Sequence, residues 1–308
     1  MKKVIAALVL IILLSSVLSF AASADTGPKP SVRISFENLG DELCYATLLS
    51  SKASTGPASA WNGKDEYAIH NENPSGHYSH LSYGYEIWKA FVDYAEKDGF
   101  YFLQRVWQIN ETKELAWTYY PPSEFKILLY FPDSESFMVS DVYERYAFDS
   151  YFTVNMHDAK LSVDYNEKLS TDKRINAHRS YNYTVEIISL AARIVITIAI
   201  EMAIAFLFFF REKKQILFLA GMNIVTQIIL NLLLNIINYS MGRGAFELFY
   251  ILFELAVVAI EAVLMLLILN KISIKPKRRL TMLAFVFLSN IASFGLGLIL
   301  AKWIPTLF

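Results

Sequence analysis

Three glutamates stand seven residues apart in an apolar part of the sequence. The stretch FELFYILFELAVVAIE, residues 246–261, contains Glu247, Glu254 and Glu261. Seven residues turn an α-helix by about 700°, nearly two full turns, so the three carboxylates are expected on one helix face. A charged group at the centre of a bilayer costs at least about 2.5–3.5 kcal/mol, so such side chains face a bundle interior, find partners or hold a proton. These carboxylates therefore offer the chemistry of a proton or cation relay.

Other apolar stretches bring polar side chains to matching depths. With a rise of about 1.5 Å per residue, Arg193 lies about 13 Å below the start of its helix, level with Glu254, and Glu201 lies about 25 Å down, near Glu261. We therefore expect an outer layer that can hold an Arg193–Glu254 ion pair, and an inner layer in which the carboxylates have no cation nearby. We call the whole set the polar seam, and its residues are Arg193, Glu201, Asn223, Gln227, Asn231, Glu254, Glu261, Asn290 and Ser293.

The inner layer has an electrostatic consequence. Two carboxyl groups close together in a low dielectric do not both ionise, so Glu201 or Glu261 is expected to hold a proton. Three interpretations of the seam remain open. It can be structural packing, because interhelical hydrogen bonds hold bundles together. It can be a pathway for an ion or small solute, or a place for intramembrane chemistry, or it can dock the transmembrane helix of a partner.

Four apolar runs carry the seam. They span roughly 184–210, 215–238, 246–269 and 280–301. Each is long enough for a helix of about 20 residues, which crosses the hydrocarbon core. The sequence therefore predicts an integral membrane protein in which residues 181–308 form a four-helix transmembrane domain.

The N-terminal residues and the loops predict the orientation. Residues 1–24 have a charged start, an apolar run and small residues before Asp25, which is typical of a secretory signal peptide; an uncleaved anchor helix is the alternative. Cleavage would leave residues 25–180 outside. Loops 211–214 and 270–279 would then be cytoplasmic, and they hold eight lysines and arginines against one in the outer loop. We expect a multi-pass protein of the cell membrane with its C-terminus outside.

Residues 25–180 have the patterns of a β-rich domain. Val32, Ile34 and Phe36 alternate with polar residues, and 143–156 alternates in the same way. Residues 100–109 and 125–131 are further predicted strands, and PDSES after Phe131 is a predicted turn. Residues 86–99 have helical spacing instead. The predicted fold class is α+β: an extracellular antiparallel β-sandwich, Ig-like in the broad sense, followed by the helix bundle.

A polar stretch between Ser50 and Gly84 is the candidate ligand loop. It contains Trp61, His70, His77 and His80. The histidine spacing matches no metal-ligand pattern, so no metal site is predicted. Trp61 and nearby tyrosines could stack on an envelope glycan or peptide, or they could fold onto the domain.

Composition and missing motifs exclude several functions. Residues 25–180 hold 23 acidic and 15 basic residues, a net charge of −8, which argues against nucleic acid as a partner. The single cysteine, Cys44, excludes an intrachain disulfide and is predicted to be a small buried hydrophobe. No nucleophile elbow, P-loop or HExxH motif is present, so we expect no cofactor and no catalytic residues.

Several segments resemble a known group. TIAIE, NIVTQIILN, FELAVVAIEA and SNIASFGLG are similar to uncharacterised four-helix bacterial membrane proteins. The outer segments SVRISFENLGDELCYATLLSSKASTGPASAW and YERYAFDSYFTV look similar to members from Gram-positive gut anaerobes, which add an extracellular domain. The resemblance covers nearly the whole mature chain, adds Thr226 to the polar seam, and implies a bacterial cell membrane. It implies no function.

Two functions follow as hypotheses. In the first, slightly preferred, the outer domain binds an extracellular ligand or partner, and the bundle anchors it or docks another membrane protein. In the second, the seam conducts a proton, a cation or a small solute, and a homodimer could complete the pathway. In both hypotheses, membrane lipid surrounds the helix bundle.

Overall fold

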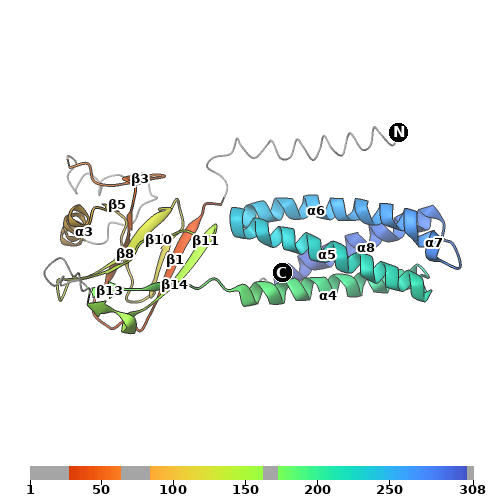
Figure 1. Ribbon diagram of the computed structural model, residues 1–308, viewed down its shortest axis with the longest axis horizontal. Coiled ribbons are helices and arrows are strands. Elements are labelled where there is room, and N and C mark those ends of the chain that lie inside the picture. The colour runs from red at the N-terminus through yellow and green to blue at the C-terminus, as the bar shows by residue number, and fades with distance from the viewer. Residues whose placement is uncertain (1–27, 64–83, 162–172, 304–308) are drawn as a thin grey trace. The chain divides into compact units, whose positions relative to one another are not determined.

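The computed structural model of the protein describes residues 28–63, 84–161 and 173–303. Two compact units divide the chain: Lys29–Tyr181 contains the strands, and the unit that begins at Asn182 contains four long helices (Figure 1). The α+β organisation predicted from the sequence is confirmed at this level. The predicted signal peptide, residues 1–24, lies outside the described residues.

The first sheet has four strands in the order β14, β11, β1 and β7. Their bounds are β1 Ser31–Glu37, β7 Glu114–Trp117, β11 Asp149–Asn155 and β14 Ala177–Arg179. β1 and β11 are parallel, whereas β7 and β14 are antiparallel to their neighbours. The expectation of a wholly antiparallel domain is therefore wrong. β1 and β11 lie far apart in the sequence, so no hairpin forces them to run in opposite directions.

The second sheet is also mixed. Its order is β12, β13, β9, β8, β2 and β5, with β10 paired to β8 and β6 paired to β2; β9 and β13 are parallel. The bounds are β2 Tyr45–Ser50, β5 Tyr101–Phe102, β6 Trp107–Gln108, β8 Glu124–Phe131, β9 Ser136–Ser140, β10 Tyr143–Glu144, β12 Lys160–Leu161 and β13 Lys173–Ile175. A small ribbon joins β3 Ser54–Thr55 to β4 Ala58–Ser59, and a 3-10 turn, η2, covers Met156–Asp158.

One hydrophobic core takes side chains from both sheets. Val32, Ile34 and Phe36 enter it from β1 at the predicted period of two. Alternate residues of β2 and β8 enter it from the second sheet. Cys44 is fully buried in this core, as predicted, and burial together with nearby Glu42 raises its pKa to about 12.

A second core lies on the other face of β2 and β8. Leu49 and Leu128 pack there against α3, Tyr85–Asp98, whose buried face includes Trp88 and Phe91. This explains why β2 and β8 are buried on both faces and show a nearly continuous apolar sequence. The predicted helix is confirmed, and Gly99 ends it with a left-handed φ of 82°.

The segment 100–109 differs from its prediction. Instead of one strand it forms β5 and β6, separated by Gln104, whose φ of 57° interrupts an extended backbone. The Gln104 side chain accepts a hydrogen bond from Nε1 of Trp88 at 3.2 Å and donates one to the Ser59 carbonyl at 3.1 Å. The break therefore places a polar side chain between α3 and the β3–β4 ribbon. The turn predicted after Phe131 is confirmed between β8 and β9.

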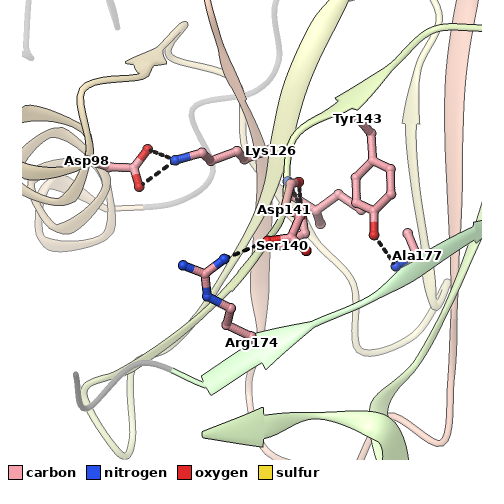
Figure 2. A network of polar contacts seen from close by, with 8 residues as sticks. Asp98, Lys126, Ser140, Asp141, Tyr143, Arg174 and Ala177 are labelled. Carbon is pink, nitrogen blue, oxygen red and sulfur yellow. Dashed lines mark hydrogen bonds and ion pairs between the residues drawn. The ribbon is translucent and has the colours of Figure 1, made fainter. Parts of the chain in front are cut away.

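Polar contacts link α3 to β8, β13 to the residue after β9, and β10 to β14 (Figure 2). Lys126 of β8 donates to both carboxylate oxygens of Asp98, at 2.9 and 2.8 Å, which fixes the end of α3. Arg174 of β13 forms an ion pair with Asp141 at 2.5 Å. The Tyr143 hydroxyl accepts from the backbone N–H of Ala177 at 2.8 Å, which joins β10 to the start of β14.

The second unit contains four long helices. They are α4 Tyr183–Leu207, α5 Lys213–Met241, α6 Arg243–Leu264 and α8 Arg279–Trp303; α6 continues through a π-helix, η3 Met265–Leu269, and α7 Asn270–Ile272. All four are long and apolar enough to cross a membrane. Each coincides closely with one of the predicted apolar runs. The π-helix was not predicted, because the run MLLIL has no feature that distinguishes it from an α-helix.

Hydrogen bonds join the loop between α4 and α5 to the loop between α7 and α8. We call this set of bonds the loop clasp. The Glu212 carboxylate accepts from the backbone N–H groups of Ile274 and Lys275 at 2.7 and 2.8 Å, and these two bonds lower its pKa. Gln215 donates to the Ser273 hydroxyl at 3.0 Å. Nζ of Lys277 donates to the Phe209 carbonyl at 2.9 Å.

Candidate functional site

The four helices form a ring of contacts in the order α4, α5, α6, α8 and back to α4. Apolar side chains cover the outside of this bundle: Val195, Leu207 and Leu255 are 65%, 74% and 63% exposed. Glu201 and Glu261, in contrast, are each 1% exposed. This distribution is the reverse of that in a water-soluble bundle and is typical of helices that face lipid.

The structure buries most of the polar seam inside the ring. The seam residues that it buries are Glu201, Asn223, Thr226, Gln227, Asn231, Glu261, Asn290 and Ser293. Arg193 and Glu254 are partly exposed. The residues expected in the inner layer, Glu201, Glu261 and Asn223, are thus all buried in the bundle.

Glu261 of α6 is held from two neighbouring helices. Its Oε1 accepts from the Thr226 hydroxyl of α5 at 2.9 Å, and its Oε2 accepts from Nδ2 of Asn290 of α8 at 2.7 Å. Both oxygens thus have a partner, so Glu261 has a fixed orientation. The π-helix η3 begins four residues later, and such segments are frequent at functional sites.

Glu201 of α4 is held less completely. Its Oε1 accepts from the Ser293 hydroxyl of α8 at 3.3 Å. Its Oε2 is buried and has no hydrogen-bond partner within the protein. Glu261 and Glu254 both lie close enough to Glu201 to repel its negative charge. Neither Glu201 nor Glu261 forms an ion pair with a lysine or arginine in the part of the chain that the structure describes.

Two amides complete the inner layer. Both polar atoms of the Asn223 side chain are buried without a partner, and so is Oδ1 of Asn290. Buried polar groups are nearly always hydrogen-bonded, because an unsatisfied one costs about 1–3 kcal/mol. With Oε2 of Glu201, the inner layer therefore offers three oxygen acceptors and one amide donor that the protein itself leaves unsatisfied.

The outer layer differs from its prediction. Arg193 does not form an ion pair with Glu254; its Nη2 donates to Oδ1 of Asn235 at 3.5 Å, and its guanidinium lies 6.0 Å from the centre of the Phe246 ring. The depth estimate gave no information on rotation about the helix axis. Nε of Arg193 is buried without a partner.

A cavity of about 390 Å³ lies beside the outer layer. All four helices line it, and Arg193, Gln227, Asn231, Glu254 and Ser293 of the seam take part. Ser293, which lines the cavity, also donates to Glu201, so one hydrogen bond connects the cavity wall with Glu201. Sequence reasoning missed the contributions of Thr197 and Tyr250. A hydroxyl at these positions is common enough in apolar helices to give no clear signal.

The candidate ligand loop is described only in part. Trp61 packs edge-on against Trp88, with ring centres 5.3 Å apart, and belongs to the second core. It therefore serves the packing of the domain. His70, His77 and His80 lie outside the described residues. Among the described residues, no group of histidine, cysteine and carboxylate side chains could hold a metal ion.

Comparisons with protein-family models, with curated proteins and with solved structures find no match for this chain. The structure by itself defines the class: a protein with β sheets in its N-terminal half and four long apolar helices in its C-terminal half, compatible with membrane anchoring.

Proposed function

We propose that this chain is a multi-pass membrane protein whose helix bundle binds a proton or a small cation at Glu201 and Glu261 and conducts it across the membrane. One observation carries the proposal: Oε2 of Glu201 is buried without a hydrogen-bond partner within the protein, and the same bundle interior buries a second carboxyl group, Glu261, and unsatisfied amide oxygens of Asn223 and Asn290. A proton on Glu201, or a cation between these oxygens, would supply the missing partner.

Packing alone accounts less well for this arrangement. A structural network is expected to satisfy its members, as Glu261 is satisfied by Thr226 and Asn290. The inner layer instead leaves Glu201 and Asn223 with unsatisfied atoms. Ionisable groups inside a bundle of apolar helices commonly mark ion or proton pathways. The cavity beside Ser293 supports access to Glu201 from one end of the bundle.

The remaining features fit a bacterial cell-membrane protein with residues 25–180 outside. Eight basic residues in loops 211–214 and 270–279 support a cytoplasmic position for these loops. The core shared by the two sheets supports an extracellular β-sandwich of broadly Ig-like type, modified by its parallel strand pairs. The signal peptide expected over residues 1–24 would deliver this domain to the outside.

A second candidate function is ligand binding by the outer domain. A recess of about 600 Å³ is lined there by Tyr143, Glu144 and Arg179 together with Val142, Phe152 and Ala177. An aromatic ring beside groups of both charges suits an envelope glycan or peptide. In that case the bundle would anchor the domain, and a partner membrane protein or a second copy would carry any signal.

The first proposal is tested by ion flux into proteoliposomes that contain the full chain. Wild type should transport protons or a monovalent cation faster than empty liposomes, and Glu201→Gln should lose at least nine-tenths of that flux. Glu111→Gln is the control, because Glu111 is exposed and belongs to the other compact unit. Equal flux in wild type and Glu201→Gln, or no flux from wild type, would refute the proposal.

A further inference from the structure

Four charged residues line the outer-layer cavity. Arg243 and Glu247 form an ion pair with each other at 3.2 Å, whereas Arg193 and Glu254 form no ion pair in the described part of the chain. At about 390 Å³ the cavity lies within the usual range for small-molecule sites, about 300–1,000 Å³. A charged group is costly inside a bundle of apolar helices, so two such groups at one cavity point to a ligand that interacts with both.

Arg193 supplies the recognition of an anion. Its single hydrogen bond to another described side chain, to Asn235, is long at 3.5 Å, and its Nε is buried without an acceptor. The centre of the Phe246 ring lies 6.0 Å from the guanidinium. A guanidinium presents a planar fork of donors that matches the two oxygens of a carboxylate.

Glu254 supplies the recognition of a cation at the same cavity. Tyr250, one turn earlier on α6, also lines the cavity, and its hydroxyl lies near the Glu254 carboxylate. A carboxylate accepts through several lone pairs, so one hydroxyl donor leaves acceptor positions free. An ammonium group carries three donors and can occupy those positions.

We propose that this cavity binds a small zwitterion of the α-amino-acid type, with its carboxylate on Arg193 and its ammonium group on Glu254. Thr197, Gln227 and Asn231 also line the cavity and provide hydroxyl and amide groups for the rest of the ligand. Phe246, Leu230 and Phe294 provide an apolar surface for its side chain. Because Arg243 and Glu247 pair with each other, Arg193 and Glu254 remain as one group of each sign, and a ligand with no net charge gives each of them a partner.

This inference goes beyond ion binding at the inner layer and does not depend on it. The two sites use different charged residues, although Ser293 touches both. Binding of a zwitterion without ion flux would support the proposal for the cavity and contradict the proposal for the inner layer. Loss of flux in Glu201→Gln with unchanged zwitterion binding would separate the two sites.

Calorimetry on the full chain in nanodiscs tests the proposal. The probes are the twenty standard amino acids, and for each one that binds, its methyl ester and its N-acetyl derivative. The ester lacks the carboxylate and the N-acetyl compound lacks the ammonium group, so each should bind wild type at least tenfold more weakly than the parent. Arg193→Gln should lose the discrimination against the ester, and Glu254→Gln should lose the discrimination against the N-acetyl compound.

Two further variants keep the test decisive. Arg193→Lys retains the charge and should fold, but without the planar fork it should bind the parent amino acid at least threefold more weakly. Arg211→Gln removes an exposed arginine from a loop and should bind like wild type. If no standard amino acid binds, if esters bind as well as acids, or if Arg193→Gln keeps the wild-type discrimination, the proposal is wrong.

Discussion

Glu201 and Glu261 accept hydrogen bonds from residues one turn apart on the same helix. Ser293 donates to Glu201 at 3.3 Å, and Asn290 donates to Glu261 at 2.7 Å. α8 therefore sets the positions of two carboxyl groups that belong to α4 and α6. Because these bonds cross between helices, they also stabilise the bundle.

Thr226→Val removes one donor to Glu261 and preserves the shape of the side chain. We expect the bundle to lose about 1–2 kcal/mol of unfolding free energy, the usual range for a buried hydrogen bond to an acidic group or between helices. Thermal unfolding in detergent measures this loss. Ser240→Ala is the control, because the Ser240 hydroxyl is exposed and bonds only backbone carbonyls of its own helix. Equal effects of the two substitutions would contradict a specific role of Thr226.

The ion pair between Lys126 and Asp98 should contribute more to stability than the pair between Arg174 and Asp141. The first pair is 18% and 15% exposed, whereas the second is 54% and 63% exposed. Water screens the exposed pair more strongly. We therefore expect a coupling energy of about 1 kcal/mol for Lys126 and Asp98, and of less than about 0.5 kcal/mol for Arg174 and Asp141.

Double-mutant cycles with Lys126→Met and Asp98→Asn, and with Arg174→Met and Asp141→Asn, measure both couplings. Denaturant unfolding followed by tryptophan fluorescence reports on the β domain in the full chain. A stronger coupling for the exposed pair would contradict the expected ranking.

Cys44 should be unreactive while the β domain is folded. Its burial and the neighbouring Glu42 raise the pKa to about 12, and only the thiolate attacks thiol reagents. At pH 8 we expect labelling at least 100-fold slower than in denaturant. Since Cys44 is the single cysteine of the chain, the labelling rate reports on opening of this core alone. Fast labelling under native conditions would show that the core around β2 is open.

The loop clasp should weaken in acid. Two backbone N–H groups hold the pKa of Glu212 below its ordinary value of 4.5. A lowered pKa in the folded state means that the contribution of the carboxylate is fully present above about pH 4.5 and is lost as the pH falls through the folded-state pKa. Hydrogen-exchange protection of the Ile274 and Lys275 amides should decrease over that range in wild type. In Glu212→Gln it should be low at every pH, and unchanged protection in this variant would contradict the clasp.

The sequence predicted the helices and strands better than it predicted which strands pair and which side chains meet. Period-two alternation identified β1, helical spacing identified α3, and the apolar runs identified four helices, because burial on one face or on all faces leaves a local pattern. The parallel pairing of β1 with β11 left no such pattern, because it joins distant segments. For the same reason the sequence could not distinguish Asn235 from Glu254 as the partner of Arg193. Depth along a helix can be counted, but rotation about its axis depends on the packing of all four helices.

Difference infrared spectroscopy on the reconstituted full chain tests ion binding at Glu201 most directly. Carboxyl bands respond when a proton or cation binds to or leaves a carboxyl group, so wild type should show a band that changes when pH or cation concentration is changed. We predict that this band is missing in Glu201→Gln and retained in Glu111→Gln. A spectrum identical in wild type and Glu201→Gln would show that Glu201 binds neither a proton nor a cation, and the search for function would move to the outer domain.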